Sequence, residues 1–393
     1  MVGGYNLNNV IHIMLHGGIY IKKEGVLGMK KIVVFILAVV ILIAALSGCD
    51  KQSDPNSGNN KNYVESTTRN EPKEESVEST TRNEPKEESV VEISSEDDLR
   101  NIERNPKGSY ILTNDIDLSQ NSNWEPLCSY SNPFTGTLDG NGYCIKSINV
   151  DVKHEKTISD SQYAGLFRCV SGATIKNLGI VGGTISISSA TSGGRAGALA
   201  GDSTPKRDGA NIKLTEVSNC WINATVESNE IEDDNPYHGC YIYVGAFFGS
   251  GCANFTNCYN LGKVSAAKTY EDQIIGGFIG SPTTYEQCPM TIKSCYSFGT
   301  LSVRHGWPGG FIGGNMGGNH VDIIDSYYYK DTAKNNQAAN SYKDTDFTSV
   351  KGLTGDELKS KSSLNWFDFN EDWAISTDKN DGYPYLRVQK TVN

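Results

Sequence analysis

The sequence predicts an all-β fold, a right-handed parallel β-helix (solenoid) with a short helical N-terminal cap and a small C-terminal cap. A phrase of small residues around a large apolar pair recurs five times between Ala164 and Tyr329. The large apolar positions of these phrases are Leu166, Leu199, Phe247, Phe278 and Phe311. They lie 33, 48, 31 and 33 residues apart, and a nearly fixed period of this length indicates a repeat architecture.

The material inside each repeat is typical of strands joined by turns. Residues 184–188 alternate Thr-Ile-Ser-Ile-Ser, which is the period of a half-buried strand. Gly182, Gly262 and Gly299 recur at one place in three repeats, where glycine supplies turn conformations. No repeat holds an amphipathic pattern long enough for a helix. Stacking one coil of strands on the next, about 4.8 Å apart, would bury a continuous narrow core.

Two phrases of the repeats carry a resemblance to a known family. Residues 276–280 read Gly-Gly-Phe-Ile-Gly, and residues 293–301 read Lys-Ser-Cys-Tyr-Ser-Phe-Gly-Thr-Leu. This pattern resembles the GLUG-motif repeat over roughly Ala164 to Tyr329, and the lead-in at 110–118 and 134–142 is similar to that of such proteins. The resemblance implies a surface lipoprotein of the parallel β-helix type. GLUG repeats also occur beside the peptidase unit of immunoglobulin-A-cleaving metallopeptidases, so the resemblance implies a fold rather than an activity.

The N-terminal part of the chain reads as an export signal. Residues 1–28 are interpreted as an upstream mis-start, and residues 29–48 as a lipoprotein signal peptide with a basic start and an apolar run at 32–46. This run is shorter than the about 20 residues of a membrane-spanning helix. It ends in Leu-Ser-Gly-Cys, which resembles a lipobox. We therefore expect Cys49 to receive diacylglycerol and to anchor the protein at the extracytoplasmic side of the cell membrane.

The remaining chain divides into a tether, a stack and a cap. Residues 49–92 hold the lipidated Cys49 and a polar segment with the composition of a disordered linker. Residues 64–76 and 77–89 repeat the same thirteen residues, through either selection for length or neutral duplication. Residues 93–340 are predicted to form the β-helix with its N-terminal cap, and residues 341–393 the C-terminal cap.

Two columns of equivalent residues read as structural. The first column holds small polar residues, namely Asn177, Asn219, Asn257, Ser294 and Asp325. Asparagine tolerates left-handed turns, so we interpret this column as a turn ladder, with a binding role as the alternative. The second column holds Cys220, Cys258 and Cys295. Single thiols one coil apart do not converge on a metal, and we interpret them as free, buried apolar residues.

An aromatic column is the candidate binding site. It holds Trp221, Tyr259, Tyr296 and Tyr327, each directly after the cysteine column. If the cysteines point inward, these rings point outward in line. An exposed aromatic stripe can stack on sugar rings or contact a partner protein. The alternative is a ladder that stacks on itself beneath loops.

Composition and motifs argue against several other classes of protein. The formal net charge of −11 disfavours nucleic acid as a partner. The acidic insertion 227–241 lacks calcium-loop spacing and reads as a solvated loop. The chain has no His-Glu-x-x-His, Gly-x-Ser-x-Gly or phosphate-loop motif. We therefore expect no catalytic residues, no metal and no cofactor.

These observations favour a non-catalytic surface protein that binds a glycan or a surface protein, in an adhesive role. The rival class is a polysaccharide-active lyase or hydrolase built on a β-helix, which would need clustered carboxylates on neighbouring coils. A third reading is a structural spacer of the cell envelope.

The lipid anchor gives the first testable prediction. Cys49→Ala should release the protein into the medium or leave it unprocessed, because the variant lacks the thiol that accepts the lipid. Membrane fractionation and mass spectrometry of the N-terminal peptide measure this. Unchanged membrane partitioning, with no acyl group on the wild-type peptide, would contradict the assignment.

Overall fold

In the computed structural model, the described residues belong to the unit that spans residues 82–393. The described residues are 89–153, 162–188, 193–229, 241–266, 273–283, 289–303, 307–315, 321–331, 338–341, 345–346 and 349–391. The segment 1–28, the signal peptide 29–48, Cys49, the tether up to residue 88 and residues 230–240 of the acidic insertion lie outside them. None of the described helices is long and apolar enough to cross a membrane.

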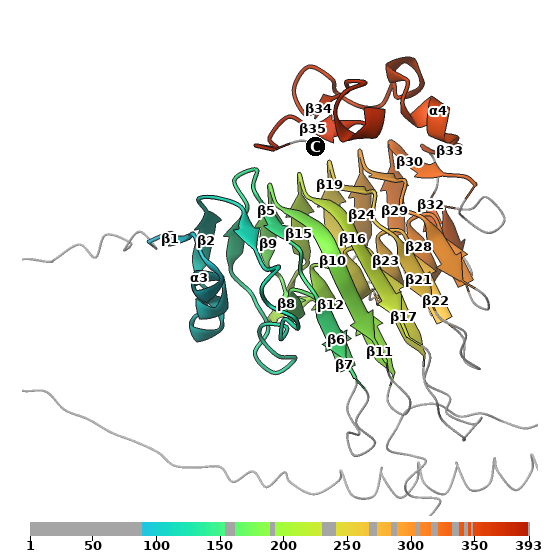
Figure 1. The fold of residues 1–393 in the computed structure, drawn as a ribbon. Helices are drawn as coiled ribbons and strands as arrows, with labels where there is room; N and C mark the ends of the chain where they lie inside the picture. Colours follow the sequence, from blue (N-terminus) through green and yellow to red (C-terminus); the bar gives the residue numbers. More distant parts are fainter. Residues whose placement is uncertain are drawn as a thin grey trace, which may run out of the picture. The chain divides into compact units, whose positions relative to one another are not determined.

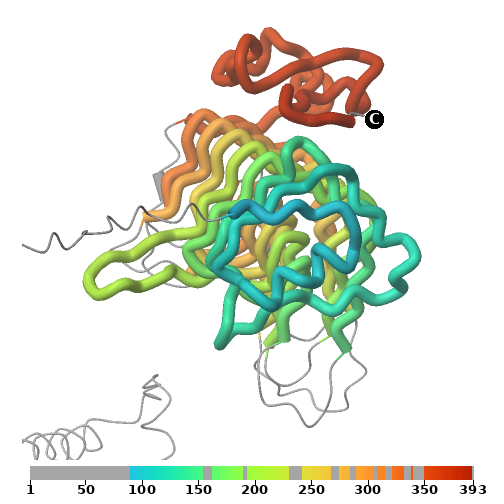
Figure 2. The backbone as a smooth tube through the Cα atoms, turned by 90° about the vertical axis from the view of Figure 1, so that its left-hand side faces the viewer, coloured from blue at the N-terminus to red at the C-terminus, as the bar shows by residue number. Residues whose placement is uncertain are grey.

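Most of the described strands join four parallel sheets, here called sheets 1 to 4. From residue 162 to residue 329 the chain passes through sheet 3, sheet 4, sheet 1 and sheet 2 in turn, and then repeats this order. Each strand pairs with the equivalent strand of the next repeat, so distant segments lie side by side (Figure 1). Figure 2 shows successive repeats behind one another. The predicted all-β class is confirmed.

Sheets 1 and 2 contain the longest runs of paired strands. Sheet 1 runs in the order β1 (Val91–Ile93), β2 (Ser109–Leu112), β4 (Thr137–Asp139), β9 (Thr174–Lys176), β15 (Thr215–Ser218), β19 (Ala253–Thr256), β24 (Met290–Lys293), β29 (Val321–Ile324) and β32 (Thr345–Asp346). Sheet 2 runs in the order β3 (Ile116–Asp117), β5 (Cys144–Lys146), β10 (Gly179–Ile187), β16 (Trp221–Ser228), β20 (Tyr259–Asn260), β25 (Tyr296–Ser297), β30 (Ser326–Tyr329) and β33 (Val350–Leu353). Beside this path, sheet 2 also contains β6 (Val150–Val152), β21 (Val264–Ala266) and β26 (Leu301–Val303).

Sheets 3 and 4 flank the recurring phrase. Sheet 3 contains β7 (Gln162–Ala164), β11 (Gly194–Ala196), β17 (Ile242–Gly245), β22 (Gln273–Gly276) and β27 (Trp307–Gly309). Sheet 4 contains β8 (Phe167–Ser171), β12 (Ala200–Thr204), β18 (Phe248–Gly251), β23 (Ile279–Pro282), β28 (Ile312–Asn315) and β31 (Ala339–Ser341). Antiparallel pairs join β13 (Lys206–Asp208) to β14 (Asn211–Lys213) and β34 (Trp373–Ala374) to β35 (Tyr385–Leu386). The helices are α3 (Glu96–Arg100), η1 (Asn101–Arg104), α4 (Gly355–Leu358), η3 (Lys361–Ser363) and η4 (Asn380–Gly382).

The core is a column of apolar side chains contributed by the recurring phrase. Its predicted members, Leu166, Leu199, Phe247, Phe278 and Phe311, are all fully buried. The ring centroid of Phe278 lies 4.7 Å from that of Phe247 and 4.9 Å from that of Phe311. In-register pairing places equivalent rings in contact, so the predicted interior faces are confirmed.

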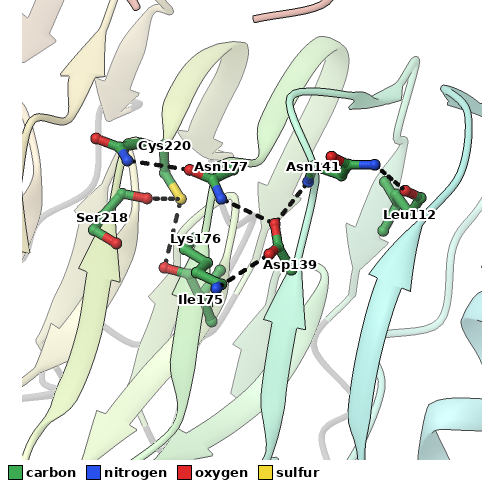
Figure 3. Close-up of polar contacts among 9 residues, drawn as sticks. Leu112, Asp139, Asn141, Ile175, Lys176, Asn177, Ser218 and Cys220 are labelled. Carbon is green, nitrogen blue, oxygen red and sulfur yellow. Dashed lines mark hydrogen bonds and ion pairs between the residues drawn. The ribbon is translucent and has the colours of Figure 1, made fainter. Parts of the chain in front are cut away.

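The turn column adopts the backbone conformation predicted for it. Its five residues have φ between 51° and 53°, the left-handed region that asparagine tolerates. The amide of Asn219 donates to Asn177 Oδ1 at 3.1 Å, and the amide of Asn177 donates to Asp139 Oδ1 at 3.0 Å (Figure 3). The side chains therefore link three neighbouring repeats at the same turn.

The cysteine column is buried, and its thiols are free, as predicted. The Cys220 thiol donates to the Ser218 carbonyl at 3.2 Å (Figure 3), and the Cys258 N–H donates to Cys295 Sγ at 3.3 Å. Burial raises the pKa of the Cys220 and Cys258 thiols well above the usual value. Burial therefore favours the protonated form of these thiols, and they hydrogen-bond to backbone groups of the turn.

The N-terminal cap forms at the predicted place. Ser95 is the N-cap of α3, and its side chain accepts the Asp98 N–H at 3.2 Å. Leu99 and Ile102 are buried against the first repeats. This apolar side covers residues that would otherwise end the stack in water.

Both predicted boundaries of the stack shift slightly. The strand β1 begins at Val91 and already pairs with β2, two residues before the predicted start at 93. Parallel pairing continues through β32 and β33 to Leu353, past the predicted end at 340. The C-terminal segment, defined here as residues 354–391, starts with Thr354 and Glu357, which form a capping box on α4.

The interior column gives the second prediction. Phe278→Ala should lower the free energy of unfolding by about 3–5 kcal/mol, because it leaves a cavity between buried rings. Lys263→Ala, at an exposed position of the same stack, should change stability by less than about 0.5 kcal/mol. Denaturant unfolding of both variants measures the difference, and equal small effects would contradict the assigned faces.

Candidate functional site

The predicted aromatic column lines up along sheet 2. Trp221 pairs in register with Tyr259, Tyr259 with Tyr296, and Tyr296 with Tyr327. The rings of Tyr259 and Tyr296 stack with centroids 4.9 Å apart and planes at 3°. The alignment of this column, called here the aromatic ladder, is therefore as predicted.

The expected exposure of the aromatic ladder is wrong. Trp221 is 2% exposed, Tyr259 is 1% exposed, and Tyr296 and Tyr327 are 0% exposed. Alternation correctly places the rings outside the main core, but the C-terminal segment covers them and forms a second apolar cluster with them. The alternative interpretation from the sequence, a covered ladder that stacks on itself, describes these four residues, and they do not form an open binding stripe.

The C-terminal segment contacts the ladder through rings and hydrogen bonds. Trp373 lies 5.6 Å from Tyr296 between ring centroids, and Trp366 lies 4.9 Å from Tyr327. The Tyr296 hydroxyl donates to the Pro384 carbonyl at 2.6 Å. Burial raises the pKa of the Tyr296 phenol well above its usual value, so this phenol stays neutral and able to donate.

The same segment runs back along the stack toward its first repeats (Figure 1). The Tyr259 hydroxyl donates to Gln389 Oε1 at 3.1 Å, and the Lys390 N–H donates to the Gly142 carbonyl at 2.8 Å. A recess of about 40 Å³ remains between the segment and Trp221, which is room for about one water molecule rather than a ligand.

A second aromatic row, which the sequence analysis did not single out, lies on sheet 3. Arg195 of β11 pairs in register with Tyr163 of β7 and with Tyr243 of β17. Its guanidinium carbon lies 5.4 Å from the Tyr163 ring centroid and 5.6 Å from the Tyr243 ring centroid. The planar cation is thus held between two aromatic rings on neighbouring repeats.

Two exposed tyrosines extend this row. The ring of Tyr130 stacks on Tyr163 at 6.0 Å, and the ring of Tyr241 stacks on Tyr243 at 6.1 Å. Tyr130 is 58% exposed and Tyr241 is 39% exposed. We call the set of Tyr130, Tyr163, Arg195, Tyr243 and Tyr241 the tyrosine–arginine row. Unlike the aromatic ladder, this row reaches the solvent.

A polar chain from sheet 4 holds the arginine in place. Arg195 Nε donates to Ser250 Oγ at 2.8 Å, and Ser250 Oγ donates to Asp202 Oδ1 at 2.9 Å. Asp202 Oδ2 lies 3.7 Å from Arg195 Nε. Asp202 is only 6% exposed, and burial raises the pKa of its carboxyl although Arg195 acts in the opposite direction. The carboxyl therefore serves as a buried anchor, out of reach of a bulky ligand.

Glycines of the recurring phrase allow sheets 3 and 4 to meet closely beside Arg195. A Cβ on Gly201 would lie 2.7 Å from Tyr163 Cβ and 3.0 Å from the Arg195 carbonyl oxygen, and one on Gly249 would meet the Ala196 nitrogen. Sheets 3 and 4 can therefore approach closely only because these positions carry no side chain. The approach brings Asp202 and Ser250 within hydrogen-bonding range of Arg195.

A sequence signal for this row does exist. One column, three residues before the large apolar position in the first repeat and four residues before it in the others, holds Tyr163, Arg195, Tyr243, Ile274 and Trp307. Alternation would have placed this column outside. The partners Asp202 and Ser250 could not have been found in the same way, since they lie on sheet 4. Their contact with Arg195 depends on the angle at which sheets 3 and 4 meet. Among the described residues, no group of three or more His, Cys, Asp or Glu side chains converges as a metal site would require.

Comparison with known proteins gives only distant structural likeness. No protein-family model matches the chain, and no curated protein matches its sequence. A candidate immunoglobulin A1 protease from Bacteroides ovatus is 18% identical with a TM-score of 0.49, and the match covers 77% of this chain and 94% of that one. A structure described as IgA1 protease is 15% identical with a TM-score of 0.37, covering 69% of this chain and 21% of that one. Likeness at this level carries no inference about activity.

The covered ladder gives the third prediction. Tyr259→Ala combined with Tyr296→Ala should lower the melting temperature strongly, because each buried ring contributes about 3–5 kcal/mol and the C-terminal segment loses two hydrogen bonds. The double variant Tyr130→Ala with Tyr241→Ala removes two exposed rings and should melt nearly as the wild type does. Calorimetry of both proteins measures this, and equal melting temperatures would contradict the structural role.

Proposed function

We propose that the protein is a lipid-anchored surface protein of the GLUG-repeat type that binds an extended glycan without catalysing a reaction. In this proposal the described unit is a right-handed parallel β-helix. The recurring order of sheets 3, 4, 1 and 2 and the in-register parallel pairing support a helical coil. Its hand follows from the strong preference for right-handed connections between parallel strands.

One observation carries the binding role, namely the solvent-reaching tyrosine–arginine row. Equivalent residues lie one repeat apart, so the row extends along the stack instead of forming a closed pocket. Tyr130 and Tyr241 offer exposed rings at its two sides, and sugar rings stack on aromatic faces. Arg195, Tyr163 and Tyr243 lie between them with polar ends that can hydrogen-bond to sugar hydroxyls.

The composition of the row favours binding over catalysis. Glycoside hydrolysis generally uses a pair of carboxylates that flank the scissile bond. Among the described residues, the carboxyl of Asp202 contacts the row through Ser250 and Arg195, which already engage it. A glycoside hydrolase of this kind would need a second carboxyl group facing that of Asp202.

The proposed anchor complements a weak site. A few ring contacts of about 0.5–1.5 kcal/mol each give modest affinity for a single chain. Many copies tethered through Cys49 would contact one glycan surface at the same time and raise the overall avidity. Adhesion is therefore the role that best combines the predicted lipid anchor with the row.

The exposed rings give the fourth prediction. The double variant Tyr130→Ala with Tyr241→Ala should weaken glycan binding by about 1–3 kcal/mol, because two stacking contacts are lost. A glycan array followed by calorimetry on the retained glycans measures this. Tyr385→Ala, in the C-terminal segment, serves as the matched control and should bind as the wild type does.

The array should be run beside a polysaccharide-degradation assay on the same glycans. Intact glycan with reduced binding by the double variant supports the proposal. Release of new chain ends by the wild type, or no loss of binding in the double variant, would overturn it.

A further inference from the structure

Among the described residues, the guanidinium of Arg195 is hydrogen-bonded along its Nε edge. In the described part of the chain, its hydrogen bond runs from Nε to Ser250 Oγ at 2.8 Å. Tyr163 and Tyr243 occupy its two faces. The side chain of Arg195 keeps 22% of its accessible surface. Among the described residues no hydrogen bond from its two terminal amines is seen, so these amines remain as donors between the two rings.

Resting on the proposed function, we propose that the glycan is acidic and that a sugar carboxylate binds the two terminal amines of Arg195. A guanidinium edge matches the two oxygens of a carboxylate, and such paired charge-assisted bonds are stronger and more directional than neutral ones. The rings of Tyr163 and Tyr243 lie on either side, and in this proposal their hydroxyls donate to neighbouring oxygens of the same sugar.

The surroundings favour short-range recognition of a carboxylate over general attraction of negatively charged polymers. The chain carries a formal net charge of −11, which disfavours long-range attraction of anions, so recognition in this proposal depends on short contacts. Asp202 lies on the Nε side, behind Ser250, where it is buried. It opposes the charge of Arg195 without blocking the terminal amines.

In this proposal Ser250 and Asp202 are positioning residues. The Ser250 hydroxyl accepts a hydrogen bond from Arg195 Nε and donates one to Asp202 Oδ1, which restrains the orientation of the guanidinium. Lysine at position 195 would keep the charge, but it has neither the planar edge nor the Nε donor. Charge alone would therefore not reproduce the site.

The test uses the full chain and two forms of one polysaccharide, polygalacturonate and its methyl-esterified form, which lacks the charge. The wild type should bind polygalacturonate at least about tenfold more tightly than the ester. Arg195→Ala should remove this preference, and Arg195→Lys should restore only part of it. Ser250→Ala should weaken binding of the acid form more than it weakens binding of the ester. Lys263→Ala removes one exposed positive charge elsewhere and should bind both forms as the wild type does.

The outcomes separate the two proposals. Three results would contradict the proposal that the ligand is acidic: equal binding of both forms, an unchanged preference in Arg195→Ala, or an equal loss in Lys263→Ala. None of them would contradict the proposed glycan-binding function. Binding of neutral glycans on the array, with none to polygalacturonate, alginate or hyaluronan, would have the same meaning. Absence of binding to every glycan would overturn the proposed function itself.

Discussion

In-register parallel pairing is the constraint on which the rest of the structure depends. Each repeat hydrogen-bonds to the next through the backbone, so a residue type that recurs at one position becomes a continuous column in space. The buried Phe247, Phe278 and Phe311, the left-handed Asn219 and Asn257, and the stacked tyrosines all follow from this one rule. Substitution at one position therefore changes the environment of its neighbours in the repeats before and after it.

Features that depend on the repeat spacing or on alternation within a repeat could be predicted from the sequence. The spacing of the phrase predicted the all-β class, and alternation within each repeat predicted that Phe278 would be buried and that Tyr259 would lie outside the main core. The left-handed turn at Asn177 could be predicted because asparagine tolerates that conformation without partners elsewhere.

Properties that depend on distant segments could not be predicted in this way. Alternation states that Tyr296 faces away from the core, but only the fold shows that Pro384 and Trp373 cover it. Likewise the column of Tyr163, Arg195 and Tyr243 is visible in the sequence, whereas its link to Asp202 depends on how sharply two sheets meet. That angle results from close backbone approach at Gly201 and Gly249, which no periodicity encodes.

The C-terminal segment has a consequence for how such a chain can evolve and fold. In an open array each repeat interacts only with its neighbours, so copies can be gained or lost and the array can unravel from either end. Here residues 354–391 span from the last repeat, at Leu353, back to Gly142 of an early one. This connection ties the number of repeats to the length of one segment, because an added copy would leave that segment too short. It also couples the late repeats to an early one, so the stack should behave as a single cooperative unit that closes only after residues 354–391 have been synthesised.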